Sequence, residues 1–404
     1  MELPQVLAVL ITTAAVASYL NYRFLHLASA IGLMAISLLI SIGLMLAAKF
    51  TAFDVSKSFA FILSIDFSNL LLHGMLPYLL FAGALHVDAR ELRNQAWPVA
   101  VLPTVGVAIA TLLIGTLFWL AAGLFGLELS FLQGLLFGAL IAPTDPIAVL
   151  GILRQAGVPK SLEAMIAGES LFNDGVAVVA FLTILGTLSA GESPSAGHIV
   201  GFLLIEAAGG IAFGCLIGWV GYRLLRGVDE YPVEIFLTLA VAAGGYAMAE
   251  AIGVSAPLAI VAAGLVVGSI GRRSAMSEKT EQQLTAFWEV VDEMLNAILF
   301  LLVGLELVTA IDVRYLGLAT LSIALVLVGR AISVALPLLM IRPMSRAPKG
   351  ALTVLTWGGL RGAISLALAM SLPAGPVRDL LLTTTYVIVA FSVLVQGLTL
   401  PRVI

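Results

Sequence analysis

Apolar stretches of about 20 residues recur along the whole chain, and each is long enough to cross a hydrocarbon core of about 30 Å. The stretches are continuous rather than alternating, which is typical of membrane helices and not of membrane strands. Only 11% of the residues are charged, against about 25% in soluble domains. We therefore expect an all-α polytopic membrane protein, and a water-soluble globule is excluded.

The short linkers between these stretches carry most of the Lys and Arg residues. We predict about thirteen spans, near residues 5–23, 27–48, 68–87, 97–122, 131–153, 163–189, 198–222, 233–251, 254–271, 287–309, 315–341, 347–373 and 379–401. Of the 20 cations, fourteen then fall in alternate linkers, four in the other linkers and two within spans. Because cytoplasmic loops are rich in Lys and Arg, we expect the N-terminus outside the cell membrane and the C-terminus in the cytoplasm.

Several classes of function are excluded by what the sequence lacks. A net charge of −4 provides no basic surface for nucleic acid. There is no GxxxxGK[ST] motif for ATP, no nucleophile–base pair for an enzyme, and no set of ligands for a resident metal. We therefore expect neither an enzyme nor a cofactor, and any transport should be driven by ion gradients.

The fifth span contains two prolines, Pro143 and Pro146, on either side of Thr144 and Asp145. Proline cannot donate a helical hydrogen bond, so the helix is expected to open here. The freed carbonyls, the carboxylate and the hydroxyl are oxygen ligands suited to a hard cation. A simple proline kink is the alternative, although a kink does not require an aspartate in the membrane.

The sixth span carries a polar patch made of Glu169, Ser170, Asn173 and Asp174. Ser170 and Asp174 lie one helical turn apart, as do Glu169 and Asn173, so the four side chains share one face. Two acids within one turn are costly in a membrane and point to an ion pathway. The alternative is that this segment lies at the water interface, but apolar residues flank it on both sides.

Two arginines, Arg330 and Arg361, lie inside later spans. Three glycines around Arg361 favour a second broken helix, and crossed broken helices expose helix ends that fixed charges neutralise. Asp145 and Arg361 suit that role. Arg330 then remains to pair with Glu169, unless it extends to the cytoplasmic face, and Asp174 is left without a committed cation. The two breaks lie seven spans apart, as expected for inverted six-span repeats with one linking helix.

Two further features stay open. Glu289, Asp292 and Glu293 form either an acidic cytoplasmic funnel that attracts cations or a solvated helix face. The ridge Gly210-x3-Gly214-x3-Gly218 packs a helix closely, either within the chain or between subunits.

These motifs resemble those of the monovalent cation/proton antiporters, in the sodium/proton exchanger branch. The resemblance covers nearly the whole chain and rests on FAGALHVDARELR (81–93), APTDPIAV (142–149), GESLFNDGVAVV (168–179), FWEVVDEMLNAILFLLVGLEL (287–307), GRAISV (329–334) and TWGGLRGAISLALA (356–369). It implies a thirteen-span fold with two crossing broken helices, and a homodimer in the lipid bilayer. It also implies a scaffold built from residues 1–96 and 190–309, the latter with the linker helix, and a moving core built from residues 97–189 and 310–404.

The resemblance also assigns roles to single residues. Thr144, Asp145, Ser170 and Asp174 match the residues that surround the cation in relatives, with Asp174 as proton carrier. Asn173 matches the asparagine typical of electroneutral members and is included in the ion-binding set. Glu169 and Arg330 match a structural ion pair, and Arg361 matches the arginine at the helix crossing. Where several relatives carry Glu in FEGAL, this chain has Ala82, so an additional acidic ligand on the third span is not expected.

The function favoured by these features is secondary antiport of Na⁺ or Li⁺ against H⁺, with both ions competing for one buried aspartate. Burial favours the neutral form of a carboxylate and a cation favours the charged form, so competition itself couples the two fluxes. With Asn173 neutral and Glu169 paired, the exchange is expected to be electroneutral and one for one. The alternatives are K⁺/H⁺ antiport, a cation channel, and ion-coupled symport of an organic anion on a similar fold.

Overall fold

Regular secondary structure in the described part of the chain is entirely helical, as the apolar stretches predict. The computed structural model describes residues 3–50, 67–87, 89–190, 196–271, 278–341, 348 and 350–404. Several cations of the predicted loops lie outside these residues, namely Lys57, Arg272, Arg273, Arg342, Arg346 and Lys349.

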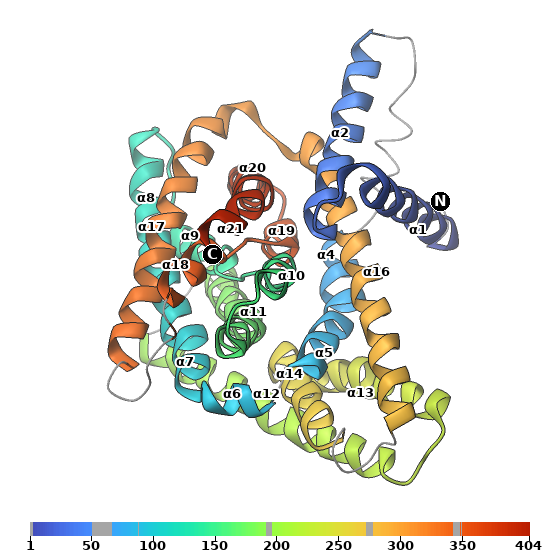
Figure 1. Cartoon of the computed structure of the whole chain (residues 1–404). Coiled ribbons are helices and arrows are strands. Elements are labelled where there is room, and N and C mark those ends of the chain that lie inside the picture. The colour runs from blue at the N-terminus through green and yellow to red at the C-terminus, as the bar shows by residue number, and fades with distance from the viewer. Residues whose placement is uncertain are drawn as a thin grey trace.

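The helices form two groups that contact one another (Figure 1). One group contains α6 (Ala89–Asn94), α7 (Ala96–Val101), η3 (Leu102–Gly106), α8 (Val107–Leu124), α9 (Phe131–Leu140), α10 (Ile147–Ala156), α11 (Lys160–Ala190), η5 (Val313–Tyr315), α17 (Leu316–Ile341), α18 (Ala351–Trp357), α19 (Ala363–Met370), α20 (Pro376–Phe391), η6 (Ser392–Gln396) and α21 (Gly397–Val403). The other contains α1 (Leu3–Leu20), η1 (Asn21–Leu25), α2 (Ser29–Phe50), α4 (Phe67–Asn69), η2 (Leu70–Met75), α5 (Leu76–His86), α13 (Tyr231–Ala251), α14 (Ala256–Val266), η4 (Val267–Gly271) and α16 (Glu278–Ala310). The long helix α12 (Ala196–Leu225) runs along the edge of both.

Seven helices of the described chain are long and apolar enough to cross a membrane, and an eighth span arises if the strongly bent pair formed by α1 and α2 counts as one. The two broken helices, the short α14 and the charged α16 are not among them, so this count is lower than the thirteen spans predicted. The polytopic helical fold is confirmed, and the number thirteen stays a prediction.

Two broken helices cross, as predicted. The first consists of α9 and α10, separated by an extended segment over residues 142–146 in which Pro143 and Pro146 provide no backbone donor. The second consists of α18 and α19, separated by the glycine-rich segment 358–362. Four helix ends thus meet inside the protein instead of at its surface.

The glycine ridge of α12 packs inside the chain. The helix lies along α14, and at Gly214 there is no space for a side chain because the backbone of Ala259 occupies it. The ridge is therefore an intramolecular contact of two closely packed helices, which resolves the choice that the sequence left open.

Candidate ion-binding site at the helix crossing

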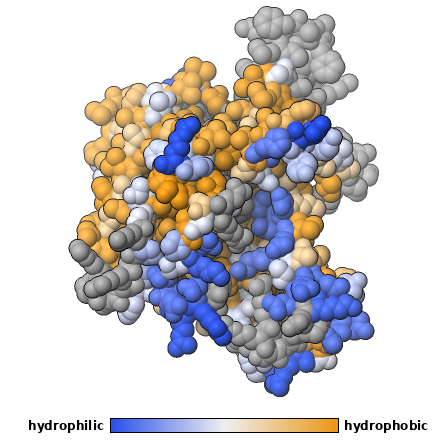
Figure 2. All heavy atoms as spheres, viewed as in Figure 1, coloured by the Kyte–Doolittle hydropathy of each residue, from blue (hydrophilic) through white to orange (hydrophobic). Residues whose placement is uncertain are grey.

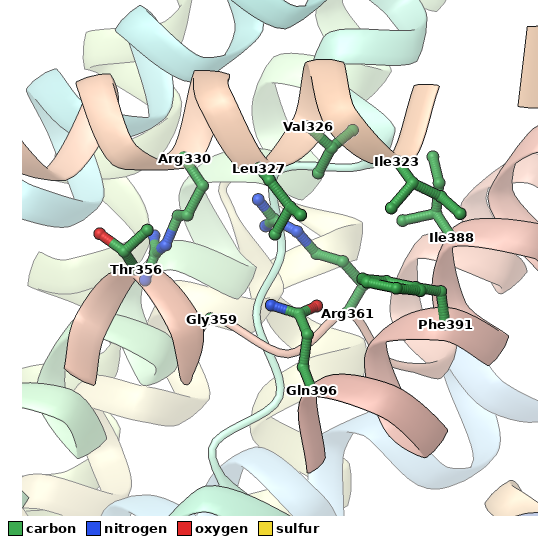
Figure 3. Close-up of a pocket in the computed structure, with 10 residues that line it drawn as sticks. All are labelled: Ile323, Val326, Leu327, Arg330, Thr356, Gly359, Arg361, Ile388, Phe391 and Gln396. Atoms are coloured by element: carbon green, nitrogen blue, oxygen red, sulfur yellow. The ribbon is translucent and has the colours of Figure 1, made fainter. Parts of the chain in front are cut away.

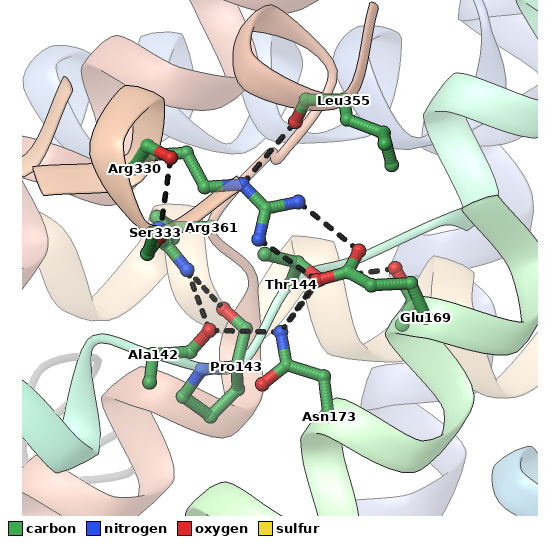
Figure 4. Close-up of polar contacts among 10 residues, drawn as sticks. Ala142, Pro143, Thr144, Glu169, Asn173, Arg330, Ser333, Leu355 and Arg361 are labelled. Atoms are coloured by element: carbon green, nitrogen blue, oxygen red, sulfur yellow. Dashed lines mark hydrogen bonds and ion pairs between the residues drawn. The ribbon is translucent and has the colours of Figure 1, made fainter. Parts of the chain in front are cut away.

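The two extended segments hold each other by backbone and side-chain bonds. The Asp145 amide donates to the Leu360 carbonyl (2.8 Å), and Arg361 Nη1 donates to the carbonyls of Ala142 (2.6 Å) and Pro143 (3.1 Å). Figure 4 shows the Arg361 guanidinium directed at these two carbonyls. They follow the C-terminus of α9, where the helix dipole is negative, so a cation there is stabilised.

The opposite charge lies at the start of α19. The segment preceding this helix ends at Gly362, and a Cβ atom at that position would meet Oδ2 of Asp145 at 3.0 Å. A carboxylate thus lies beside a helix N-terminus, the favourable end for an anion. The structure therefore places Asp145 and Arg361 at the two ends that the sequence predicts them to neutralise.

Glu169 and Arg330 form a buried pair with two parallel hydrogen bonds. Nη1 of Arg330 lies 2.8 Å from Oε1 of Glu169 and Nη2 lies 3.0 Å from Oε2, with side-chain exposures of 8% and 2%. Nε of Arg330 also donates to the Leu355 carbonyl near the end of α18 (3.2 Å). Arg330 does not extend to the cytoplasmic face; it joins α17, α11 and the second broken helix.

Gly359 permits this arrangement. A Cβ atom there would meet Nε of Arg330 at 2.5 Å and Cζ at 3.0 Å, so a side chain would displace the guanidinium. Figure 3 shows Gly359 between the side chains of Arg330 and Arg361, in a small pocket on the α17 side of the crossing. The glycine in this motif is thus required for packing around the ion pair.

Three polar side chains connect α11 to the first broken helix. The hydroxyls of Thr144 and Ser170 lie 3.0 Å apart, and Nδ2 of Asn173 donates to Oγ1 of Thr144 and to the carbonyl of Ala142, both at 3.1 Å. Asn173 therefore presents its nitrogen to the extended segment. Its Oδ1 atom is buried and has no hydrogen-bond partner within the described residues, so the place of Asn173 in the ion-binding set stays a prediction.

Asp174 differs from the other acids of the site. The residue is 7% exposed, and Oδ1 has no hydrogen-bond partner within the described residues. No Lys, Arg or His of that part of the chain forms an ion pair with it. Glu169, one turn earlier, is fully engaged by Arg330, so of these two acids of α11 Asp174 is the one without an ion-pair partner in the described chain.

A cavity of about 1060 Å³, lined by residues of both helix groups, reaches the site. Pro143, Thr144, Asp145 and Asp174 line it, whereas Ser170 and Asn173 lie behind this lining. Figure 2 shows hydrophilic residues gathered between the two groups and below them, and a mostly hydrophobic surface elsewhere on this face. An ion from water can thus reach Asp174 from one side.

Two groups near the site, the Leu355 carbonyl and the Asn296 amide, are not expected from the sequence. The Leu355 carbonyl has no sequence signal, because any residue provides a carbonyl. Asn296 belongs to the motif over residues 287–307, to which the sequence assigns no role at this position; it lines the cavity opposite the crossing, and its amide oxygen is buried. Its position one turn after Asp292 in a membrane span was a signal available in the sequence.

Comparison with known proteins agrees with this architecture. The family described as "Sodium/hydrogen exchanger, transmembrane" matches residues 11–404. The chain is 47% identical over 402 residues to the Na⁺/H⁺ antiporter NhaP of Pseudomonas aeruginosa, covering 97% of this chain and 94% of that protein. It is 37% identical over 334 residues to the Na⁺/H⁺ antiporter NhaH of Halobacillus aidingensis, covering 81% of each.

Among solved structures, the sodium proton antiporter MjNhaP1 of Methanocaldococcus jannaschii at pH 8 superposes with a TM-score of 0.77. The match covers 100% of this chain and 98% of that one at 19% identity, so it establishes the fold. Taken with the family match over nearly the whole length and the two close relatives, it leads to one conclusion: this chain belongs to the sodium/hydrogen exchanger family.

Proposed function

We propose that this protein exchanges Na⁺, or Li⁺, for H⁺ across the cell membrane, with the two ions competing for Asp174. The proposal rests on the burial, accessibility and ion pairing of this carboxylate. It is buried, reached by the cavity, and has no ion-pair partner in the described chain, while Glu169 beside it is neutralised by Arg330. A lone buried carboxylate is stable when it binds a proton or a cation.

The cation would be held by oxygen atoms that the helix break exposes. Asp174 supplies a carboxylate, Asp145 a second one and Thr144 a hydroxyl, all at the cavity. Ser170 supplies a hydroxyl within 3.0 Å of that of Thr144. Each of these is a hard ligand suited to a small cation such as Na⁺. Because the relatives are named as Na⁺/H⁺ antiporters, we propose Na⁺ and not K⁺ as the substrate of this protein.

Proton and cation would be exchanged one for one. Asn173 is neutral and its nitrogen is used in positioning, so it adds no titrating group beside Asp174. The site then carries the same charge with a proton as with Na⁺, and the rate of exchange should not follow an imposed membrane potential. A steady current on solid-supported membranes would contradict one-for-one exchange.

The two helix groups suggest alternating access, in which the group holding Asp174 moves against the group holding α16. The cavity is lined by Glu91, Lys160 and Pro401, which lie beside the linkers rich in Lys and Arg. We therefore assign the cavity to the cytoplasmic side, with the N-terminus outside and the C-terminus in the cytoplasm. The expected assembly is a homodimer embedded in lipid.

The test is transport by the purified protein in liposomes with an acidic interior and no organic solute. External Na⁺ or Li⁺ should drive proton efflux, and K⁺ should do so far more weakly. Efflux that requires an organic anion would favour symport, and Na⁺ uptake without proton movement would favour a channel. Either result would overturn the proposal.

A further inference from the structure

A second group of oxygen atoms faces the helix crossing from the other wall of the cavity, on α16. Asp292 and Asn296 lie one turn apart on this helix and both line the cavity. Nδ2 of Asn296 donates to the backbone carbonyl of Asp292 (2.8 Å) and to its Oδ1 atom (3.1 Å). Both bonds use the amide nitrogen of Asn296, so neither involves its amide oxygen.

The amide oxygen of Asn296 has no donor. The residue is only 6% exposed, and Oδ1 is buried without a hydrogen-bond partner in the described chain. Most buried polar atoms in proteins are satisfied, so this oxygen, on a residue that lines the cavity, can accept a bond from an ion or water molecule held there. Two bonds already use the amide nitrogen, so the atom presented to this ligand is an acceptor.

The charge around this position selects a cation. The described lining of the cavity includes one lysine, two histidines (His26 and His86) and seven carboxylates, from Glu91, Asp145, Glu163, Asp174, Glu289, Asp292 and Glu293. Glu293 accepts a hydrogen bond from the Ser29 hydroxyl (2.8 Å), whereas no Lys, Arg or His of the described chain pairs with Asp292. Asp292 and Asp145 line the same cavity from different helix groups, so negative side chains face it from both and favour a cation within it.

We propose that Asp292 and the amide oxygen of Asn296 form a loading site for a partly hydrated monovalent cation, separate from the site at Asp174. Two protein oxygens leave room for water around the ion, so the ion is held before it is fully dehydrated. This inference rests on the antiport function proposed above. Because α16 belongs to one helix group and Asp174 to the other, the loading site serves the protein only on the side where the cavity opens.

That one-sidedness makes the inference testable. Asp292→Asn should raise the KM for Na⁺ by about fivefold when Na⁺ is applied from the cavity side, as expected for loss of about 1 kcal/mol of attraction in a hydrated site. The KM from the opposite side should not change. Everted and right-side-out membrane vesicles present the two sides separately. Glu128→Gln is the matched control, since Glu128 is exposed between α8 and α9 and away from the cavity; it should leave both values unchanged.

Asn296→Ala keeps the carboxylate, removes the amide oxygen, and should raise the KM on the same side only, so the test does not depend on one variant folding. An unchanged KM on both sides in either folded variant, or an equal rise on both sides, would overturn the inference.

Equilibrium binding of radioactive sodium separates this inference from the proposed function. Asp174→Asn protein, without its main site, should still bind Na⁺, and Asp174→Asn/Asp292→Asn protein should not. If Asp174→Asn retains exchange, the proposed function of Asp174 fails. If it loses exchange and binds no Na⁺ either, the loading site alone is overturned.

Discussion

Breaking the Glu169–Arg330 pair should destabilise the protein more by single than by double substitution. Both side chains are buried and joined by bonds of 2.8 and 3.0 Å, so removing one partner leaves an unpaired charge, which typically costs about 3–5 kcal/mol. Arg330→Gln should be worse than Glu169→Gln by about 1 kcal/mol, because the Leu355 carbonyl also loses its donor. The double variant should recover roughly 2–3 kcal/mol of the summed loss.

The free energy of unfolding is measured by denaturant titration in detergent micelles, for the parent protein and the three variants. Arg314→Gln is the control, because it breaks a pair with Asp312 in which the arginine side chain is 74% exposed, and it should have no measurable effect. Additive losses in the double variant, or a Glu169→Gln loss no larger than that of Arg314→Gln, would refute the assignment of a buried, mutually neutralising pair.

Three further changes test the surroundings of the site. Ser170→Ala removes the hydroxyl 3.0 Å from that of Thr144 and should raise the KM for Na⁺ by about fivefold; an unchanged KM would exclude Ser170 from cation binding. Gly359→Ala should lower the free energy of unfolding by about 1–3 kcal/mol, measured by denaturant titration, because its methyl group would meet the Arg330 guanidinium. Asn173→Asp replaces an amide that donates to the Thr144 hydroxyl by a carboxyl group beside Glu169. The folded protein therefore favours the protonated form of the new aspartate. Relative to the parent it should lose stability as pH rises, and a gain with rising pH would contradict the role of the amide nitrogen.

Much of the fold follows from local chemistry. Pro143 and Pro146 cannot donate hydrogen bonds, so a break around Asp145 was predictable, and the glycines around Arg361 predicted the second break. The sharp bend between α1 and α2 was not predicted, because the apolar runs 5–23 and 27–48 have the length and composition of two separate membrane spans. Hydropathy sets which segments lie in the membrane, and tertiary packing sets how they bend.

The site was predictable where charge decides the partners. Arg330 and Glu169 are costly in a membrane unless they meet, and the structure places them together. The orientation of Asn173 was not predictable, because it depends on the Ala142 carbonyl and Thr144 hydroxyl of a distant segment. The position of Asn296 beside the cavity was not predictable either, because the cavity is formed by helices that are distant in the sequence.

The central claim is that Na⁺ and H⁺ compete for the carboxylate of Asp174. Asp174→Asn keeps the size of the side chain and removes its charge, so the most direct measurement is Na⁺-driven proton movement by this variant in proteoliposomes, beside the parent protein. The expected result is a folded variant with no exchange at any pH or Na⁺ concentration. Sodium-driven proton movement by Asp174→Asn at a rate near that of the parent would contradict the claim.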